Sequence, residues 1–98
     1  MKDVFLKPGK ERSLLRRHPW VFSGAVGRAE AADDGETVRI LDSRGEFLAL
    51  GCRSNSSAIA LRVWSFDERE VIDGAFFKRR IDAAYVLRQR ILEVILRR

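Results

Sequence analysis

The chain has 98 residues with one cysteine and one histidine, a net charge of +5 and a sequence pI of about 10.1. This length supports one small domain with a modest core. One cysteine excludes an internal disulfide, and one histidine with one cysteine cannot supply the usual ligands of a structural zinc site. No apolar run approaches the roughly 20 residues that span a bilayer, and the first residues lack the apolar core of a signal peptide. We therefore expect a cytoplasmic protein, and the positive charge favours a polyanionic partner, nucleic acid first.

A basic run followed by an aromatic run occupies residues 7–22. Residues 3–7 predict a first strand, and Pro8-Gly9 predicts a turn after it. Residues 10–17 predict a helix of two turns, which we expect Pro19 to end because proline disfavours helical geometry at the residue before it. Buried unpaired charge is costly, so the cations of this helix should face solvent, where they can bind phosphates: Lys10, Arg12, Arg16 and Arg17. In the strand that follows, Trp20 and Phe22 are expected to pin the helix onto the core.

Short strands dominate the middle of the chain. Residues 37–42 alternate between apolar and polar side chains, which predicts a strand. Asp42-Ser43-Arg44-Gly45 predicts a tight hairpin turn, and residues 46–52 predict a strand that is central because it is apolar on both faces. Residues 58–66 predict a further strand. This spacing, with one short helix, indicates a small curved sheet or partial barrel.

The pattern changes at Asp73, a candidate N-cap, and apolar residues then recur at helical spacing as far as Arg98. The apolar stripe of this helix is wider than a small barrel could cover. We therefore expect a division into a barrel over residues 1–70 and a helix over residues 71–98. We also expect the chain to be cut from a longer one, and its last helix to have lost its partner.

Several motifs, taken together, resemble a known family. Gly9-Lys10-Glu11-Arg12, Arg17-His18-Pro19-Trp20-Val21-Phe22-Ser23-Gly24, and the segments 57–67 and 76–81 occur in order at the family's spacing. They resemble the N-terminal PUA domain of the large-subunit ribosomal RNA methyltransferases that make 5-methylcytosine. The resemblance implies an α+β, mainly β, PUA-like pseudo-barrel of five to six strands, with one short helix after the first strand and a long C-terminal helix.

The same resemblance implies a function. It implies a module that binds ribosomal RNA of the large subunit and positions the methyltransferase, with S-adenosylmethionine used only by the full-length protein. No Gly-rich strand-to-helix turn suited to a cofactor is present. The family's catalytic cysteines belong to a later domain, and Cys52 does not match them. We expect this chain by itself to be no enzyme and to hold neither a cofactor nor a metal.

The candidate RNA-binding residues follow from the resemblance and from charge: Lys10, Arg12, Arg16, Arg17, His18, Arg53 and Arg62. Two roles are open for His18, an RNA contact or a cap on the helix end. Trp20 could stack a base, but a core position is favoured. Arg62 is either a phosphate contact or an internal partner for Glu11 or Asp67.

A rival function comes from the C-terminal helix, whose apolar stripe is also typical of a non-catalytic scaffold or a homodimerisation module. A stand-alone enzyme is disfavoured, because no nucleophile and base can be named. We expect no membrane partner.

Overall fold

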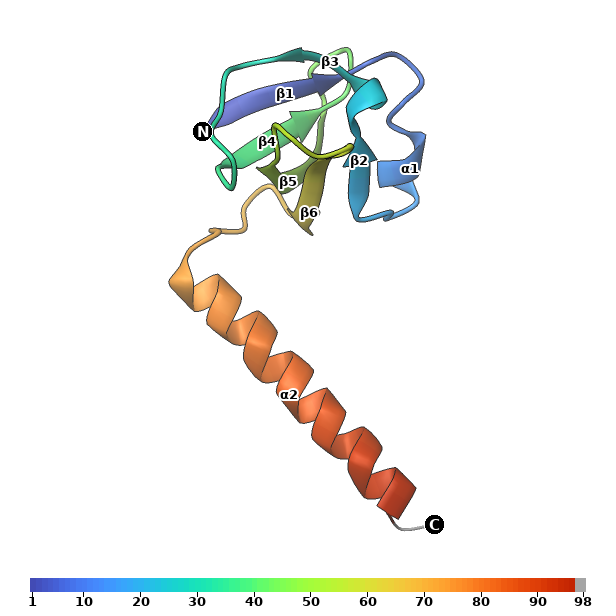
Figure 1. The fold of residues 1–98 in the computed structure, drawn as a ribbon, viewed down its shortest axis with the longest axis vertical. Helices are drawn as coiled ribbons and strands as arrows, with labels where there is room; N and C mark the ends of the chain where they lie inside the picture. Colours follow the sequence, from blue (N-terminus) through green and yellow to red (C-terminus); the bar gives the residue numbers. More distant parts are fainter. Residues whose placement is uncertain (97–98) are drawn as a thin grey trace.

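The structure, a computed structural model, describes residues 1–96 as a curled six-stranded sheet with a short helix at its side and a long C-terminal helix (Figure 1). This is the expected α+β pseudo-barrel. The elements in chain order are β1 (Lys2–Leu6), α1 (Arg12–Leu15), β2 (Trp20–Phe22), the 3-10 turn η1 (Ser23–Ala25), β3 (Val26–Ala29), β4 (Thr37–Leu41), β5 (Phe47–Arg53), β6 (Ile59–Ser65) and α2 (Gly74–Leu96).

The strands lie in the order β2-β6-β5-β4-β1-β3. The β1–β4 pair is parallel and the other pairs are antiparallel. β5 is central, as its apolar residues predicted, and β2 and β3 form the two edges. β3 was not among the strands predicted from the sequence. It forms a strand because β1 supplies a partner edge for it, with Val4 opposite Ala29.

The core fills the inside of the curled sheet, and nearly every strand contributes buried side chains to it. Its fully buried members include Val4, Leu6, Leu14, Val38, Ile40, Ala49 and Leu61. Gly51 of β5 is needed for a close strand approach, because a Cβ there would lie 2.8 Å from the carbonyl oxygen of Arg62. Leu14 brings α1 into the same core, so the short helix is fixed against the sheet.

The helix α1 is shorter than predicted and ends for another reason. It has a single turn, and its end is set at Arg17 and not at Pro19. Arg17 has a φ of +66°, its N–H donates to the Leu14 carbonyl at 2.9 Å, and the His18 N–H donates to the Ser13 carbonyl at 2.9 Å. This pair of bonds around a left-handed residue is the Schellman C-cap, in which glycine is the usual occupant.

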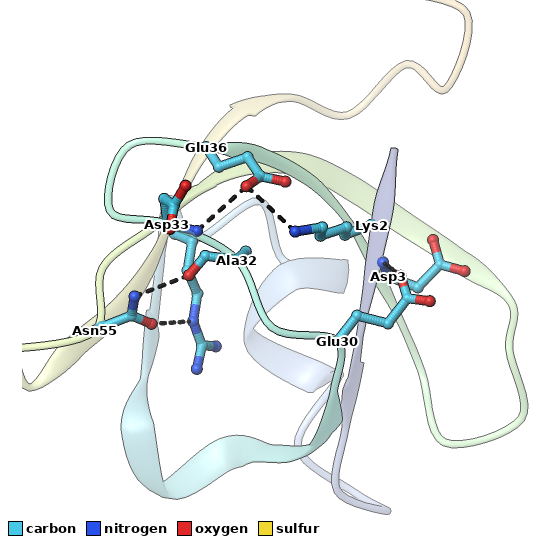
Figure 2. Close-up of polar contacts among 8 residues, drawn as sticks. Lys2, Asp3, Glu30, Ala32, Asp33, Glu36 and Asn55 are labelled. Atoms are coloured by element: carbon cyan, nitrogen blue, oxygen red, sulfur yellow. Dashed lines mark hydrogen bonds and ion pairs between the residues drawn. The ribbon is translucent and has the colours of Figure 1, made fainter.

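Polar contacts join β1, the loop over residues 30–36 and Asn55 (Figure 2). Lys2 pairs with Glu36 at 3.6 Å, and Asn55 donates its side-chain N–H to the Ala32 carbonyl at 2.8 Å. On β1, Asp3 receives two hydrogen bonds from Arg39, at 2.8 and 3.0 Å. These bonds from the Arg39 side chain lower the pKa of Asp3.

The helix α2 leaves the barrel and runs away from it (Figure 1), so the molecule measures 52 × 27 × 26 Å. Its first turn is anchored. Asp73 caps it as predicted, accepting from the Phe76 N–H at 2.8 Å, and Phe76 is 2% exposed. The Phe77 ring meets Trp64 edge-on at 5.1 Å, and the Arg80 guanidinium donates to the Trp64 carbonyl. The described part of α2 ends at Leu96, so the predicted extension to Arg98 lies outside the described residues.

Candidate nucleic-acid interface

Within residues 1–96, the cations around α1 form no ion pair with an acidic side chain. Lys10, Arg12 and Arg16 are exposed, and none of them takes part in an ion pair within residues 1–96. The one acid of this segment, Glu11, is half-buried and its Oε2 atom is shielded from solvent. In the part of the chain that the structure describes, the positive charge around α1 is therefore exposed and is not neutralised by neighbouring carboxylates.

Two of these cations lie on one face of the helix. The Arg16 N–H donates to the Arg12 carbonyl at 3.2 Å, so the two residues are one turn apart. Like charges at this spacing repel each other and destabilise a helix by about 0.2–0.5 kcal/mol. An anion such as a phosphate removes that repulsion, and arginine can contact it through two N–H groups.

Arg17 is held differently from its neighbours. Its backbone is left-handed, and its guanidinium carbon lies 4.5 Å from the centre of the Phe66 ring. Stacking on an aromatic face orients the cation without neutralising it. Arg17 thus remains a positive charge at the end of α1, and it is held there by its contact with Phe66, the residue that follows β6.

In the aromatic strand β2, the buried and exposed residues are the opposite of those predicted. Val21 is the buried residue, at 3% exposed, whereas Trp20 is 43% exposed and Phe22 is 54% exposed. The expectation that Trp20 and Phe22 anchor the core was therefore wrong. Successive strand residues point to opposite faces, so either Val21 or the two aromatic residues can enter the core, but not both. Val21 enters it because it pairs with the buried Leu61.

A hollow of about 400 Å³ lies between α1 and the edge strand β2. Lys10 and Ser13 line it from the side of the helix, and Trp20 and Phe22 line it from the strand. The sequence prediction missed this hollow. The sequence feature that could have indicated it is the Trp-Val-Phe run of residues 20–22, but this pattern fits equally well whether Val21 or the two aromatic side chains face outward.

His18 also lines this hollow and fixes the start of β2. Its Nδ1 atom accepts the Trp20 backbone N–H at 3.2 Å, and its ring meets the indole nearly at right angles, with the ring centroids 6.1 Å apart. Of the two roles left open, the helix cap is provided by the backbone N–H of His18 and not by the imidazole. The side chain instead orients Trp20.

The structure brings Arg62 to the same surface. Arg62 of β6 lies directly opposite Trp20 in the β2–β6 ladder, and residues opposite each other point to the same face of a sheet. Arg62 is exposed, and none of the ion pairs within residues 1–96 joins it to Glu11 or Asp67. The internal partner considered for it is therefore not found in the described residues.

Arg53 lies apart from this group. It pairs with Leu61, and Leu61 pairs with Val21, so Arg53 belongs to the row on the opposite face of the sheet from Trp20. Its Nε donates to the side-chain oxygen of Asn55 at 3.0 Å. Of the sequence-predicted residues, Lys10 and His18 line the hollow and Arg62 shares a face of the sheet with Trp20, whereas Arg53 lies in the row on the other face.

Residues 1–96 contain no group of three or more His, Cys, Asp and Glu side chains arranged to hold a metal ion. None of the helices in these residues has an apolar stretch long enough to cross a membrane.

The curled six-stranded sheet and the helix inserted after its first strand define a PUA-like domain. A family model described as a PUA-like domain matches residues 4–66, and the chain belongs to that family.

Curated relatives point to one kind of protein. The chain is 53% identical over 91 residues to Ribosomal RNA large subunit methyltransferase I of Klebsiella pneumoniae subsp. pneumoniae, a match covering 92% of this chain and 23% of the relative. It is 58% identical over 82 residues to the protein of that name from Escherichia coli O9:H4, covering 83% of this chain and 21% of the relative. The chain thus spans less than a quarter of the length of these relatives.

Solved structures agree on the fold. A putative SAM-dependent methyltransferase from Streptococcus mutans has a TM-score of 0.56 at 15% identity, over 72% of this chain and 18% of that chain. A chain of an H/ACA ribonucleoprotein bound to a substrate RNA has a TM-score of 0.54 at 17% identity, over 71% of this chain and 25% of that chain. At these identities the likeness shows the fold alone.

Proposed function

We propose that this chain is an RNA-binding module that positions a ribosomal RNA cytosine-5 methyltransferase on its substrate in the cytoplasm. The observation that carries the proposal is the exposed group of cations on α1, which has no acidic partner within residues 1–96. The relatives named as large-subunit ribosomal RNA methyltransferases support the choice of RNA. Methyl transfer from S-adenosylmethionine would belong to the remaining three-quarters of such a protein.

Within this proposal, the module divides into the barrel, residues 1–70, and a connecting helix, residues 71–98. Lys10, Arg12 and Arg16 contact successive phosphates along one side of the RNA, since all three are exposed on α1 or directly beside it. The remaining proposed contacts come from the end of that segment and from the sheet: Arg17, His18 and Arg62. Arg53 would contact RNA only where the RNA extends around the sheet, because Arg53 lies on the face of the sheet opposite to Trp20 and Arg62.

An NMR titration of the 98-residue chain with a ribosomal RNA hairpin tests the proposal. Backbone amide shifts should change at residues 10–18 and around Arg62 and stay constant in α2 and in residues 30–36. The changes should weaken as salt is raised, because phosphate contacts release counterions. Shifts confined to α2, or no shifts at millimolar RNA, would refute this function for the α1 surface.

A second candidate function rests on the exposed apolar side chains of α2. Ile81, Tyr85 and Leu92 are each at least half exposed, and Leu87, Ile91, Val94 and Ile95 are similarly exposed. An apolar stripe of this length is typical of a surface that another helix covers. The second candidate is therefore a scaffold or homodimerisation module that acts through α2.

Sedimentation velocity separates the two candidates. Dimerisation through α2 predicts a concentration-dependent dimer that is insensitive to salt and is lost when the chain is cut after Asp82. That cut keeps the contacts of Phe76, Phe77 and Arg80 with the barrel. A chain that stays monomeric at high concentration would contradict the second candidate without affecting the first.

A further inference from the structure

Beyond its first two turns, α2 exposes an apolar face to solvent. The start of the helix is fixed on the barrel, because Phe76 is buried and both Phe77 and Arg80 contact Trp64 of β6. The rest of α2 projects away from the barrel (Figure 1). Large side chains there are each at least half exposed, and they define the apolar face of α2: Ile81, Tyr85, Leu87, Ile91, Leu92, Val94 and Ile95.

One cation interrupts the apolar face. Ala84 and Tyr85 lie four and three residues before Arg88. Ile91 and Leu92 lie three and four residues after it. Residues at these spacings are neighbours on one side of a helix, so Arg88 has apolar side chains both before and after it. None of the ion pairs within residues 1–96 includes Arg88. A protein surface that covers the apolar face would also cover this guanidinium, and a buried charge is costly unless it is paired.

We infer that the apolar face of α2 docks on the catalytic part of a methyltransferase, and that a carboxylate of that part pairs with Arg88. Arg88 is then a positioning residue, which fixes the direction of the barrel relative to the catalytic part. The inference rests on the proposed function only in taking this chain as a module of such a methyltransferase.

The relatives supply the argument for this partner. The match to the Klebsiella protein covers 92% of this chain, so it extends into α2. Because the match covers only 23% of that protein, the helix there is joined to a much larger remainder. Covalent attachment gives that remainder an effective concentration on the order of millimolar at α2, which favours it over a separate partner.

A second copy of α2 suits the apolar face less well. Over Gly74–Leu96 the helix has five basic and two acidic residues, so two copies side by side repel each other. Asp82 lies six residues before Arg88 and Glu93 lies five residues after it, which places both acids on another side of the helix. Asp82 already pairs with Lys78 at 2.8 Å. Two copies joined through the apolar face would therefore bury Arg88 without a carboxylate.

Hydrogen exchange tests the docking. The sample is a chimera in which this chain replaces the matching segment of the Klebsiella relative, and the reference is the 98-residue chain alone. Backbone amides of residues 83–96 should exchange at least about 10-fold more slowly in the chimera, because docking covers this part of α2. Amides of β4 in the core should be equally protected in both proteins.

The direction of one substitution effect identifies the group opposite Arg88. Arg88→Met keeps a long side chain but removes its charge. If a carboxylate lies opposite, the variant leaves that acid buried without a partner, and the extra protection of residues 83–96 should be lost. Against a purely apolar surface, the same variant would increase the protection. Arg88→Lys retains the positive charge and should keep more of the protection than Arg88→Met.

Arg90→Met is the matched control. Arg90 lies two residues after Arg88, on nearly the opposite side of α2, and the substitution removes the same charge. It should change the protection by less than about two-fold. The unmodified Klebsiella relative gives a second measurement, which holds even if the chimera fails to fold. Its residues that match α2 should also be protected.

Each other outcome counts against the inference. Equal exchange of α2 in the chain alone and in the longer proteins would overturn it, and so would increased protection in Arg88→Met. Protection that rises with the concentration of the chain alone would assign the apolar face to a second copy and also overturn it. The NMR titration with RNA reports on the α1 surface separately, so a failure of the proposed function is distinguished from a failure of this docking.

Discussion

Neutralising the two arginines that share one face of α1 gives the sharpest test of the phosphate contacts. We consider Arg12→Gln combined with Arg16→Gln. Glutamine and arginine have nearly equal helix propensity, and both arginines are exposed, so the fold should be preserved. The change also removes the repulsion between two like charges one turn apart, so the stability of the variant should not fall.

The expected loss follows from counterion release. Each phosphate contact adds about 0.7 to 0.9 to the slope of log K against log salt. Because neither arginine is paired with an acid within residues 1–96, both charges are fully available to the RNA. Losing both contacts should reduce the slope by about 1.4–1.8, which corresponds to about 25- to 60-fold weaker binding at 0.1 M salt.

Fluorescence anisotropy with a labelled ribosomal RNA hairpin, repeated from about 0.05 to 0.3 M salt, measures both quantities. The matched control is Arg88→Gln with Arg90→Gln on α2, which changes the net charge by the same amount at a distance from the barrel. If binding depends only on total charge, both pairs will weaken it equally. Equal losses, or an unchanged slope in the α1 variant, would refute the assignment of α1 as the phosphate-binding element.

Three further predictions concern the fold. Gly51→Ala should lower the free energy of unfolding by about 1–3 kcal/mol in a denaturant titration, because its Cβ would lie 2.8 Å from the Arg62 carbonyl oxygen; a neutral result would contradict this contact. Asp3→Asn should lower the melting temperature at pH 7, and this difference should begin to shrink below about pH 4. Arg39 lowers the pKa of Asp3, so the stabilisation is fully present above the unfolded pKa and is lost as pH falls through the lower folded one. A difference that did not shrink at all as the pH was lowered below about 4 would assign the effect to something other than charge. Arg17→Gly should be more stable than Arg17→Ala by about 1 kcal/mol, the reverse of their order inside a helix, since φ is +66°; an unchanged order would argue against the left-handed cap.

Much of the fold could be predicted because its signals are local. The predicted hairpin turn at residues 42–45 is present, with Gly45 at a φ of +89°, and the Asp73 side chain caps α2. The alternating residues of β4 and the apolar run of β5 likewise gave strands close to their predicted bounds. The division of the chain at residue 70 and the individual RNA contacts remain predictions.

The errors in the prediction share one cause. Which face of β2 is buried and where α1 ends both depend on contacts with residues far along the chain, and not on neighbouring residues alone. Val21 enters the core because β2 pairs with β6, about 40 residues further along the chain. α1 ends early because Arg17 takes a left-handed backbone and places its side chain over Phe66.

The sequence by itself determined the composition of the candidate site, namely a basic segment, an adjoining aromatic strand and the turns that separate them. Only the tertiary structure decided which of these side chains share a surface. Arg62 lies beside Trp20 whereas Arg53 lies in the opposite row, although both arginines were equally plausible candidates. The physical reason is strand register, because a shift of one residue in the pairing moves every side chain of a strand to the other face of the sheet.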